Sequence, residues 1–139
     1  MTGAEDFTRL VLWQRSQQLA ADIAAVVATL PRNKAADIIG SQVMRSAGSI
    51  PANIAEGYGR FSQAAYRNHL SIARGSAFET HSWIDLLHRS GFLDDAAKSR
   101  LTESCKDVGR LLTLRMKALS NGTKTYAARE EGEGYRVDD

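Results

Sequence analysis

The sequence predicts an all-α protein, an antiparallel up-and-down four-helix bundle followed by a disordered C-terminal tail. Three observations indicate this fold class. Apolar residues recur every three or four positions in four long segments, which is the spacing of one face of an α-helix. The breaks between these segments are short, and the 139 residues contain only 2 prolines, fewer than the turns of an all-β chain usually need. Four helices of matched length with short loops are most simply arranged as an antiparallel bundle.

The first helix is expected at about residues 6–30. Pro31 ends it, and Asn33 is a suitable N-cap for the next helix. The apolar residues that define its face are Leu12, Leu19, Ile23, Val26 and Leu30.

The second helix is expected at about residues 34–56. Pro51 lies inside it and should kink the helix or remove one backbone hydrogen bond near Ala47. Gly57 and Gly59 follow, and we expect a glycine here to end the helix in a left-handed cap. The apolar stripe consists of Ile39, Val43, Ala47, Ile50 and Ile54. A polar stripe runs beside it and consists of Gln42, Arg45, Ser49, Asn53 and Glu56.

The third and fourth helices are expected at about residues 63–90 and 95–120. Ser62 and Asp94 are suitable N-caps, and Gly91 fits the end of the third helix. These helices complete a single bundle domain at residues 1–120. The apolar stripes consist of Tyr66, Leu70, Ala73, Ala77, Ile84 and Leu87 in the third helix, and of Leu101, Cys105, Val108, Leu112 and Leu119 in the fourth.

Residues 121–139 differ in composition from the bundle. They hold three glycines and many charges, so they offer too little apolar surface to offset the entropy of ordering, and we expect a flexible tail. The tail has a net charge of −2, which leaves +4 on residues 1–120. No apolar run is long enough to span a membrane, and the N-terminus lacks the features of a signal peptide. We therefore expect a cytoplasmic protein with no membrane partner.

The segment at residues 41–60, SQVMRSAGSIPANIAEGYGR, is distinctive. It resembles the signature of the 23S rRNA intervening-sequence protein family of four-helix bundles, which also includes accessory proteins of diversity-generating retroelements. Three shorter segments match that family in the same order, LVLWQ at 10–14, LSIARGSAFE at 70–79 and GFL at 91–93. Met44 stands where the family has the first arginine of a pair, so only Arg45 remains.

The resemblance implies a ring-shaped homopentamer without enzymatic activity. Through the retroelement accessory proteins, it also implies a basic surface that binds nucleic acid and a reverse transcriptase. We therefore expect a non-catalytic oligomer that binds RNA or DNA through a basic surface repeated around a ring. The alternative is a structural or adaptor protein that binds a protein partner such as a polymerase and has no nucleic-acid affinity of its own.

Arginines are the candidate nucleic-acid contacts because a guanidinium group pairs well with phosphate. Arg67 and Arg74 lie on one stripe of the third helix together with Phe78 and His81. The alternative for this stripe is a solvated face on which Arg74 pairs with a carboxylate, either Glu79 or Glu56. The four candidates are Arg45, Arg60, Arg67 and Arg74.

The signature residues also have a structural interpretation, as determinants of packing and oligomer formation. Glu56 is costly to bury unpaired, so we expect Ser49, Asn53 and Glu56 to satisfy one another and an arginine, Arg45 or Arg74, within or between bundles. The residues assigned to this role are Gln42, Ser49, Pro51, Asn53, Glu56, Gly57, Gly75 and Glu79.

No catalytic residue, metal site or cofactor is predicted. His81, Asp85 and His88 share a helical face with suitable ligand chemistry, but helix faces collect polar residues in any case. Cys105 falls on a core stripe, where a buried and inert thiol is expected. Trp13 and Trp83 are expected to anchor the core or an interface.

Overall fold

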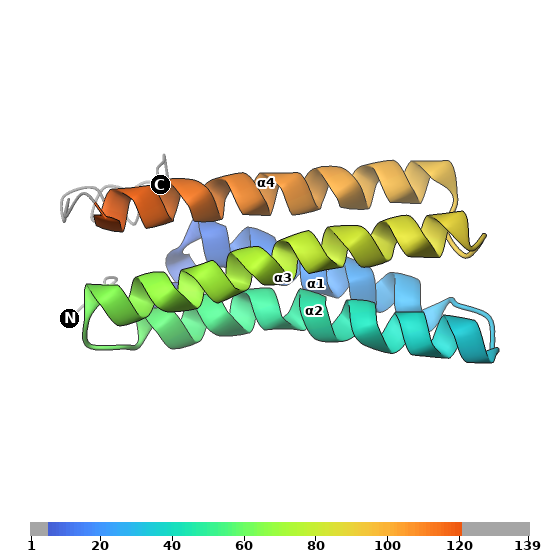
Figure 1. Cartoon of the computed structure of the whole chain (residues 1–139), viewed down its shortest axis with the longest axis horizontal. Coiled ribbons are helices and arrows are strands. Elements are labelled where there is room, and N and C mark those ends of the chain that lie inside the picture. Colours follow the sequence, from blue (N-terminus) through green and yellow to red (C-terminus); the bar gives the residue numbers. More distant parts are fainter. Residues whose placement is uncertain (1–5, 121–139) are drawn as a thin grey trace.

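The computed structural model describes residues 6–120. Successive helices run in opposite directions along one long axis (Figure 1), so the predicted all-α up-and-down bundle is confirmed. The tail expected at 121–139 lies outside the described residues. The elements are η2 (Phe7–Arg9, a 3-10 helix), α1 (Val11–Ala28), α2 (Lys34–Tyr58), α3 (Gln63–Arg89) and α4 (Asp95–Ser120).

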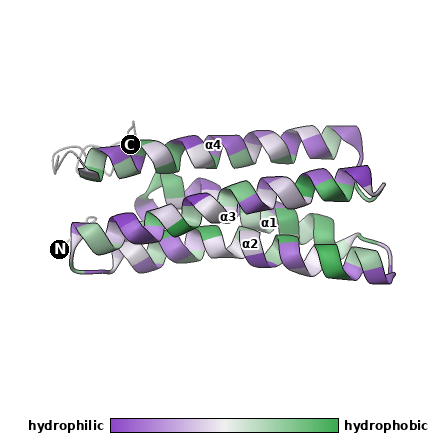
Figure 2. Cartoon of the chain, in the orientation of Figure 1, coloured by the Kyte–Doolittle hydropathy of each residue, from purple (hydrophilic) through white to green (hydrophobic). Residues whose placement is uncertain are grey.

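The helices enclose one core. α2 packs on α3, α3 on α4, and α1 on both α2 and α4. Hydrophilic and hydrophobic residues alternate along each helix (Figure 2), as expected for helices with one buried face. None of the described helices combines the length and the apolar character needed to cross a membrane. Among the fully buried side chains are Leu12, Leu19, Ile23, Val43, Ile50, Ile54, Leu70, Ile84, Leu101 and Leu112.

Side-chain caps mark the starts of three helices. Asn33 Oδ1 accepts a hydrogen bond from the backbone N–H of Ala36 at 2.8 Å. Ser62 Oγ accepts from Ala65 at 3.0 Å, and Asp94 Oδ1 accepts from the third residue after it at 2.8 Å. Each cap satisfies one of the N–H groups that a first helical turn leaves without a partner.

The first segment differs from the continuous helix expected at residues 6–30. Asp6 accepts a hydrogen bond from Thr8 N–H and starts the short helix η2. Leu10 then takes an extended conformation, with ψ of 126°, and its side chain is fully buried. α1 begins only at Val11 and ends at Ala28. The apolar stripe did not reveal this break, because it begins only at Leu12. A continuous helix would place Leu10 about 200° from Leu12, on the opposite face.

The expected left-handed glycine cap at the end of α2 is wrong. Gly59 has a φ of −82°, and Gly57 lies inside the helix. Within residues 6–120, positive φ among the glycines is recorded at Gly91, with φ of 83°, after α3. α2 also runs without interruption through Pro51, which is buried.

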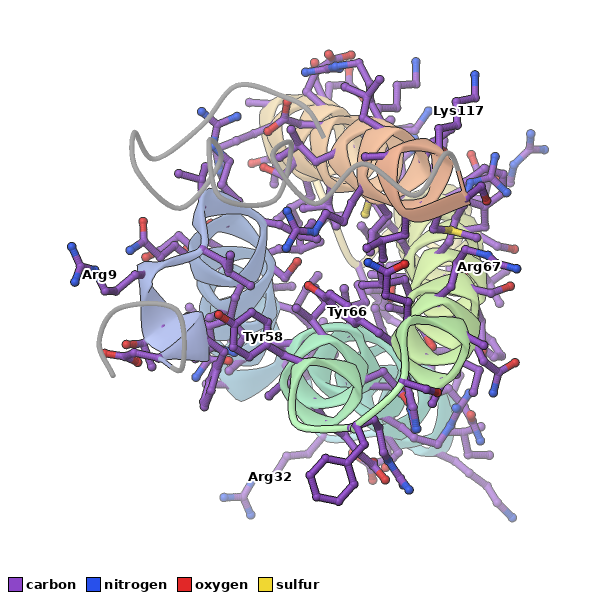
Figure 3. All side chains as sticks on the ribbon, turned by 90° about the vertical axis from the view of Figure 1, so that its left-hand side faces the viewer. Arg9, Arg32, Tyr58, Tyr66, Arg67 and Lys117 are labelled. Carbon is purple, nitrogen blue, oxygen red and sulfur yellow. The ribbon has the colours of Figure 1, made fainter. Side chains whose placement is uncertain are left out.

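An arginine is buried in the core at the end of the bundle where α4 finishes. Arg115 is 2% exposed, and its guanidinium carbon lies 5.5 Å from the centre of the Tyr66 ring. Tyr66 meets Tyr58 edge to face, with 5.8 Å between ring centres. Figure 3 shows both tyrosines pointing between the helices. Trp13 and Trp83 are partly buried and pack against the core.

Candidate nucleic-acid interface

The polar stripe of α2 faces α3 and forms a hydrogen-bonded seam, which we call the α2–α3 seam. Ser49 Oγ lies 2.9 Å from Ser76 Oγ. The hydroxyls of Ser46 and Thr80 lie 2.8 Å apart, and both residues are fully buried. A hydroxyl both donates and accepts, so each pair satisfies itself without water. The seam therefore places polar groups inside the bundle without leaving them unpaired.

Asn53 continues the seam toward the end of α2. Its amide nitrogen donates to the backbone oxygen of Ser49 at 2.9 Å, and its Oδ1 lies 3.0 Å from Nδ1 of His69. Glu56 lies 3.9 Å from the other ring nitrogen of the same histidine. Gly57 is buried directly against α3, where a Cβ atom would lie 2.7 Å from the Cβ of His69. The signature thus contributes contacts between two helices of one chain.

Arg45 and Glu79 form an ion pair across the exposed edge of the seam. Gln42 accepts a hydrogen bond from Arg45 Nε at 3.0 Å, and Trp83 Nε1 donates to Glu79 at 2.9 Å. The Trp83 hydrogen bond first, and the Arg45 guanidinium second, hold the pKa of the Glu79 carboxyl below its ordinary value. Arg45 is therefore engaged by a carboxylate of its own chain.

Arg60 is engaged in the same way. Its guanidinium lies 2.6 Å from Glu56, four residues earlier, and both side chains are about half exposed. An exposed pair of this kind contributes little stability, but it offsets the positive charge of the arginine. Two of the four candidate arginines thus have a carboxylate neighbour on or beside the seam.

Arg67 and Arg74 lie on the opposite side of α3, toward α4. Arg74 Nε donates to Thr113 Oγ1 at 2.8 Å, and its guanidinium carbon lies 4.7 Å from the centre of the Phe78 ring. Within residues 6–120, neither arginine lies within 4.0 Å of a carboxylate, so the expected pairing of Arg74 with Glu79 or Glu56 does not form. Figure 3 shows Arg67 on the same side of the bundle as Lys117 of α4.

A groove between α3 and α4 brings the cations of both helices together, and we call it the α3–α4 groove. Its main cavity has a volume of about 400 Å³, and a second cavity of about 250 Å³ shares Arg74 and Thr113 with it. Among the described residues, no carboxylate lines either cavity. The basic residues that line them are Arg74, His81, Lys106, Arg110 and Lys117.

Two carboxylates lie near the groove without lining it. Asp107 forms ion pairs with two arginines, Arg110 of the same helix and Arg15 of α1. The pair with Arg15 measures 2.6 Å. Glu103 lies 4.0 Å from Lys106, and both of these side chains are well exposed. Asp107 offsets the charge of Arg110, and the exposed pair of Glu103 with Lys106 is weak at this distance. Within residues 6–120, Arg74 and Lys117 have no carboxylate within 4.0 Å, so the groove keeps a positive balance.

Sequence reasoning found the α3 half of this groove and missed the α4 half. Lys106, Arg110 and Lys117 follow one another at spacings of four and seven, which is one helix face. That pattern was visible in the sequence. Which helix that face would meet depends on the order of the helices around the core, and periodicity does not give this order.

The three residues considered as metal ligands have separate partners. Asp85 bonds Arg89 at 2.7 Å, and this hydrogen bond is the main cause that lowers the pKa of Asp85. His88 bonds Asp95 at 2.6 Å, and His81 lines the α3–α4 groove. Residues 6–120 contain no group of three or more histidine, cysteine or acidic side chains placed to hold a metal ion.

Cys105 forms part of the groove floor, but only 3% of its surface is exposed. Burial raises the pKa of its thiol to about 12. The thiol therefore stays protonated at neutral pH and is a poor nucleophile.

The fold and its polar seam define a class of small four-helix-bundle proteins. A family model for the 23S rRNA-intervening sequence protein matches residues 8–114. The chain belongs to this family.

A solved structure supports the assignment. It is that of a protein of unknown function from the S23 ribosomal protein family of Bacteroides thetaiotaomicron, with a TM-score of 0.69 and 28% sequence identity. The match covers 73% of this chain and 94% of that one. The comparison with curated proteins gives no match.

Proposed function

We propose that this chain is a non-catalytic, homo-oligomeric protein of the cytoplasm that binds RNA or DNA through the α3–α4 groove. The observation that carries the proposal is a set of cations from two helices around cavities that no carboxylate of residues 6–120 lines. Arginine and lysine bind phosphate, and a continuous positive surface supplies most of the affinity of sequence-independent binding. Copies of the groove repeated around a ring would enlarge this surface.

The four candidate arginines are not equally suited to bind phosphate in this proposal. Arg67 and Arg74 remain candidates because they lie toward α4. Arg45 and Arg60 are weaker candidates because Glu79 and Glu56 already neutralise them. Lys106 and Lys117 join the proposed contacts, whereas Arg110 is a weaker candidate for the same reason, because Asp107 pairs with it.

The proposal is tested by fluorescence anisotropy with a structured RNA and a DNA duplex over a series of salt concentrations. We expect the affinity to fall steeply as the salt concentration rises. The slope of the logarithm of the binding constant against the logarithm of the salt concentration counts the phosphates contacted. A variant with Lys106→Gln and Lys117→Gln should weaken binding to both ligands. Its slope should be smaller by about one for each contact removed. Both lysines are exposed, so the fold should persist.

The matched control removes the same charge from another part of the surface. Arg9→Gln with Arg32→Gln serves, because Figure 3 shows these arginines on the side of the bundle away from Arg67 and Lys117. Equal weakening by both double variants would assign binding to net charge and not to the groove. Absence of binding at low salt would contradict the proposal.

One observation favours the alternative of an adaptor that binds a protein. The most exposed residues of α3 before Arg89 carry no charge, and they include Ile72 and Leu86 at 46% and 39% exposure. A surface of this kind suits a protein contact, with a polymerase or with another copy of this chain. Failure of the binding test would leave this face as the basis of function.

A further inference from the structure

Phe78 gives the α3–α4 groove a feature that phosphate binding does not need. Its side chain lies in the lining of the main cavity and is 59% exposed. The Arg74 guanidinium lies over the ring, 4.7 Å from its centre. A large aromatic ring left in water at the edge of a cationic cavity is a potential stacking surface.

The cavity floor beside this ring is apolar and is formed by residues with small side chains. Ala77, Cys105 and Gly109 line the cavity beside Phe78. A Cβ atom at Gly109 would lie 3.5 Å from Cε1 of Phe78, so the edge of the ring lies close to α4 at this glycine. The absence of a side chain at this glycine leaves space next to the ring. The volume of about 400 Å³ falls within the range of small-ligand sites.

The groove therefore combines a flat apolar surface with cations at short intervals. A polymer with a planar ring and a phosphate in every unit fits this combination. Single-stranded nucleic acid offers both groups, whereas a duplex hides the faces of its bases in its own stack. The second cavity, which Lys117 and Met116 line, continues from the first through Arg74 and Thr113 and extends the path along the strand.

We propose that the α3–α4 groove binds single-stranded nucleic acid in preference to duplex, with an unpaired base against Phe78 and the flanking phosphates on Arg74, Lys106 and Lys117. This inference rests on the proposed function. It specifies that the nucleic acid is single-stranded and that Phe78 is the residue that selects the single strand. Phosphate contacts alone would bind a duplex at least as well as a single strand, since a duplex has the higher charge density.

The test compares three DNA ligands with the full chain by fluorescence anisotropy. They are a short oligothymidine, the same strand with one central base removed to leave an abasic unit, and a duplex of the same length. We expect the intact single strand to bind most tightly. Phe78→Ala should weaken that binding on the order of tenfold, the loss typical of one base–aromatic stack. The same substitution should change the affinities for the abasic strand and the duplex much less.

Two further variants separate stacking from the loss of an exposed apolar group. Phe78→Trp keeps an aromatic ring and should retain the affinity for the single strand. Ile38→Ala removes an apolar side chain of α2 that is 55% exposed but does not line the groove, and it should have no effect. Size-exclusion chromatography with light scattering checks that all variants share one assembly state.

The outcomes distinguish this inference from the proposed function. Equal affinity for the three ligands, unchanged by Phe78→Ala, would overturn base stacking and leave phosphate binding in place. A groove that accepts an acidic protein segment instead would bind none of the ligands even at low salt. That result would overturn both proposals.

Discussion

Gly57 shows how closely two helices approach at a single residue. A Cβ atom there would lie 2.7 Å from the Cβ of His69 and 3.1 Å from the ring of Tyr66. The His69 Cβ is attached to the backbone of α3, so it cannot rotate away. The glycine is needed for this approach and not for a left-handed turn, because its conformation is helical.

We expect Gly57→Ala to destabilise the protein although alanine favours helix. The overlap with α3 should cost about 1–3 kcal/mol, more than the gain of about 1 kcal/mol in helix propensity. Urea unfolding followed by circular dichroism measures the free energy of unfolding. Gly48→Ala in the same helix is the control, because nothing lies within 4 Å of a Cβ there. It should stabilise the protein by roughly 0.5–1 kcal/mol. A Gly57→Ala variant as stable as the control would contradict this account.

At the scale of elements, α3 has two chemically different sides. One side forms the α2–α3 seam through Ser76, Glu79 and Thr80, and the other forms the α3–α4 groove through Arg74 and Phe78. The signature that carries the family resemblance lies on the seam. The signature therefore reports packing between α2 and α3 and does not by itself locate a ligand-binding surface.

The Glu79 carboxylate makes the stability of the seam depend on pH. The pKa of Glu79 is depressed in the folded chain by Trp83 and Arg45, so its contribution is present above the pKa of the unfolded chain. That contribution is lost as the pH falls through the lower, folded value. We expect the free energy of unfolding of Trp83→Phe to fall less between about pH 5 and about pH 3 than that of the natural chain. Urea titrations at the two pH values measure this difference.

Glu79→Gln is the reference for the pH experiment, because it removes the titrating group. The pH dependence of this variant should be the shallowest of the three proteins. Identical pH dependence in Glu79→Gln and the natural chain would show that the seam does not depend on this ionisation.

The sequence predicted most of the helical framework for identifiable reasons. Asn33, Ser62 and Asp94 are short polar residues directly before apolar periodic segments, and each caps a helix. The break at Leu10 escaped prediction because the apolar stripe that predicts this helix begins only at Leu12 and carries no information on the chain before it. Half of the candidate site also escaped prediction, because the meeting of Lys106 and Arg110 with Arg74 depends on tertiary packing.

At the scale of the whole molecule, the uncharged side of α3 is the candidate surface for contact between copies of the chain. Exposed residues on this side include Ser71, Ile72, Gly75, Ser82 and Leu86. Gly75 has open space around it, since no neighbouring group of residues 6–120 lies within 4 Å of a Cβ atom there. Its small size is thus not required by packing within one chain. A second copy of the chain is the partner that the resemblance implies.

We expect the protein to sediment as an oligomer, a pentamer by the family resemblance. Ile72→Glu combined with Leu86→Glu should shift it to the monomer, because burying two carboxylates without partners is costly. Sedimentation velocity measures the change. Leu114→Glu is the control, since this residue of α4 is also partly exposed, at 38%, but lies on another helix. A monomeric natural chain, or an oligomer that resists the double substitution, would contradict this expectation.

In a bundle with an even number of antiparallel helices, the first helix begins at the same end of the bundle at which the last helix ends. The start of α1 and the end of α4 lie at the same end of the bundle (Figure 1). Joining them by a short linker and opening the turn between α1 and α2 would give a circular permutant with the order α2–α3–α4–α1. The seam and the groove depend only on neighbours within the unbroken run from α2 to α4. Both should persist in the permutant, because the contribution of α1 is to complete the core by packing on α2 and α4.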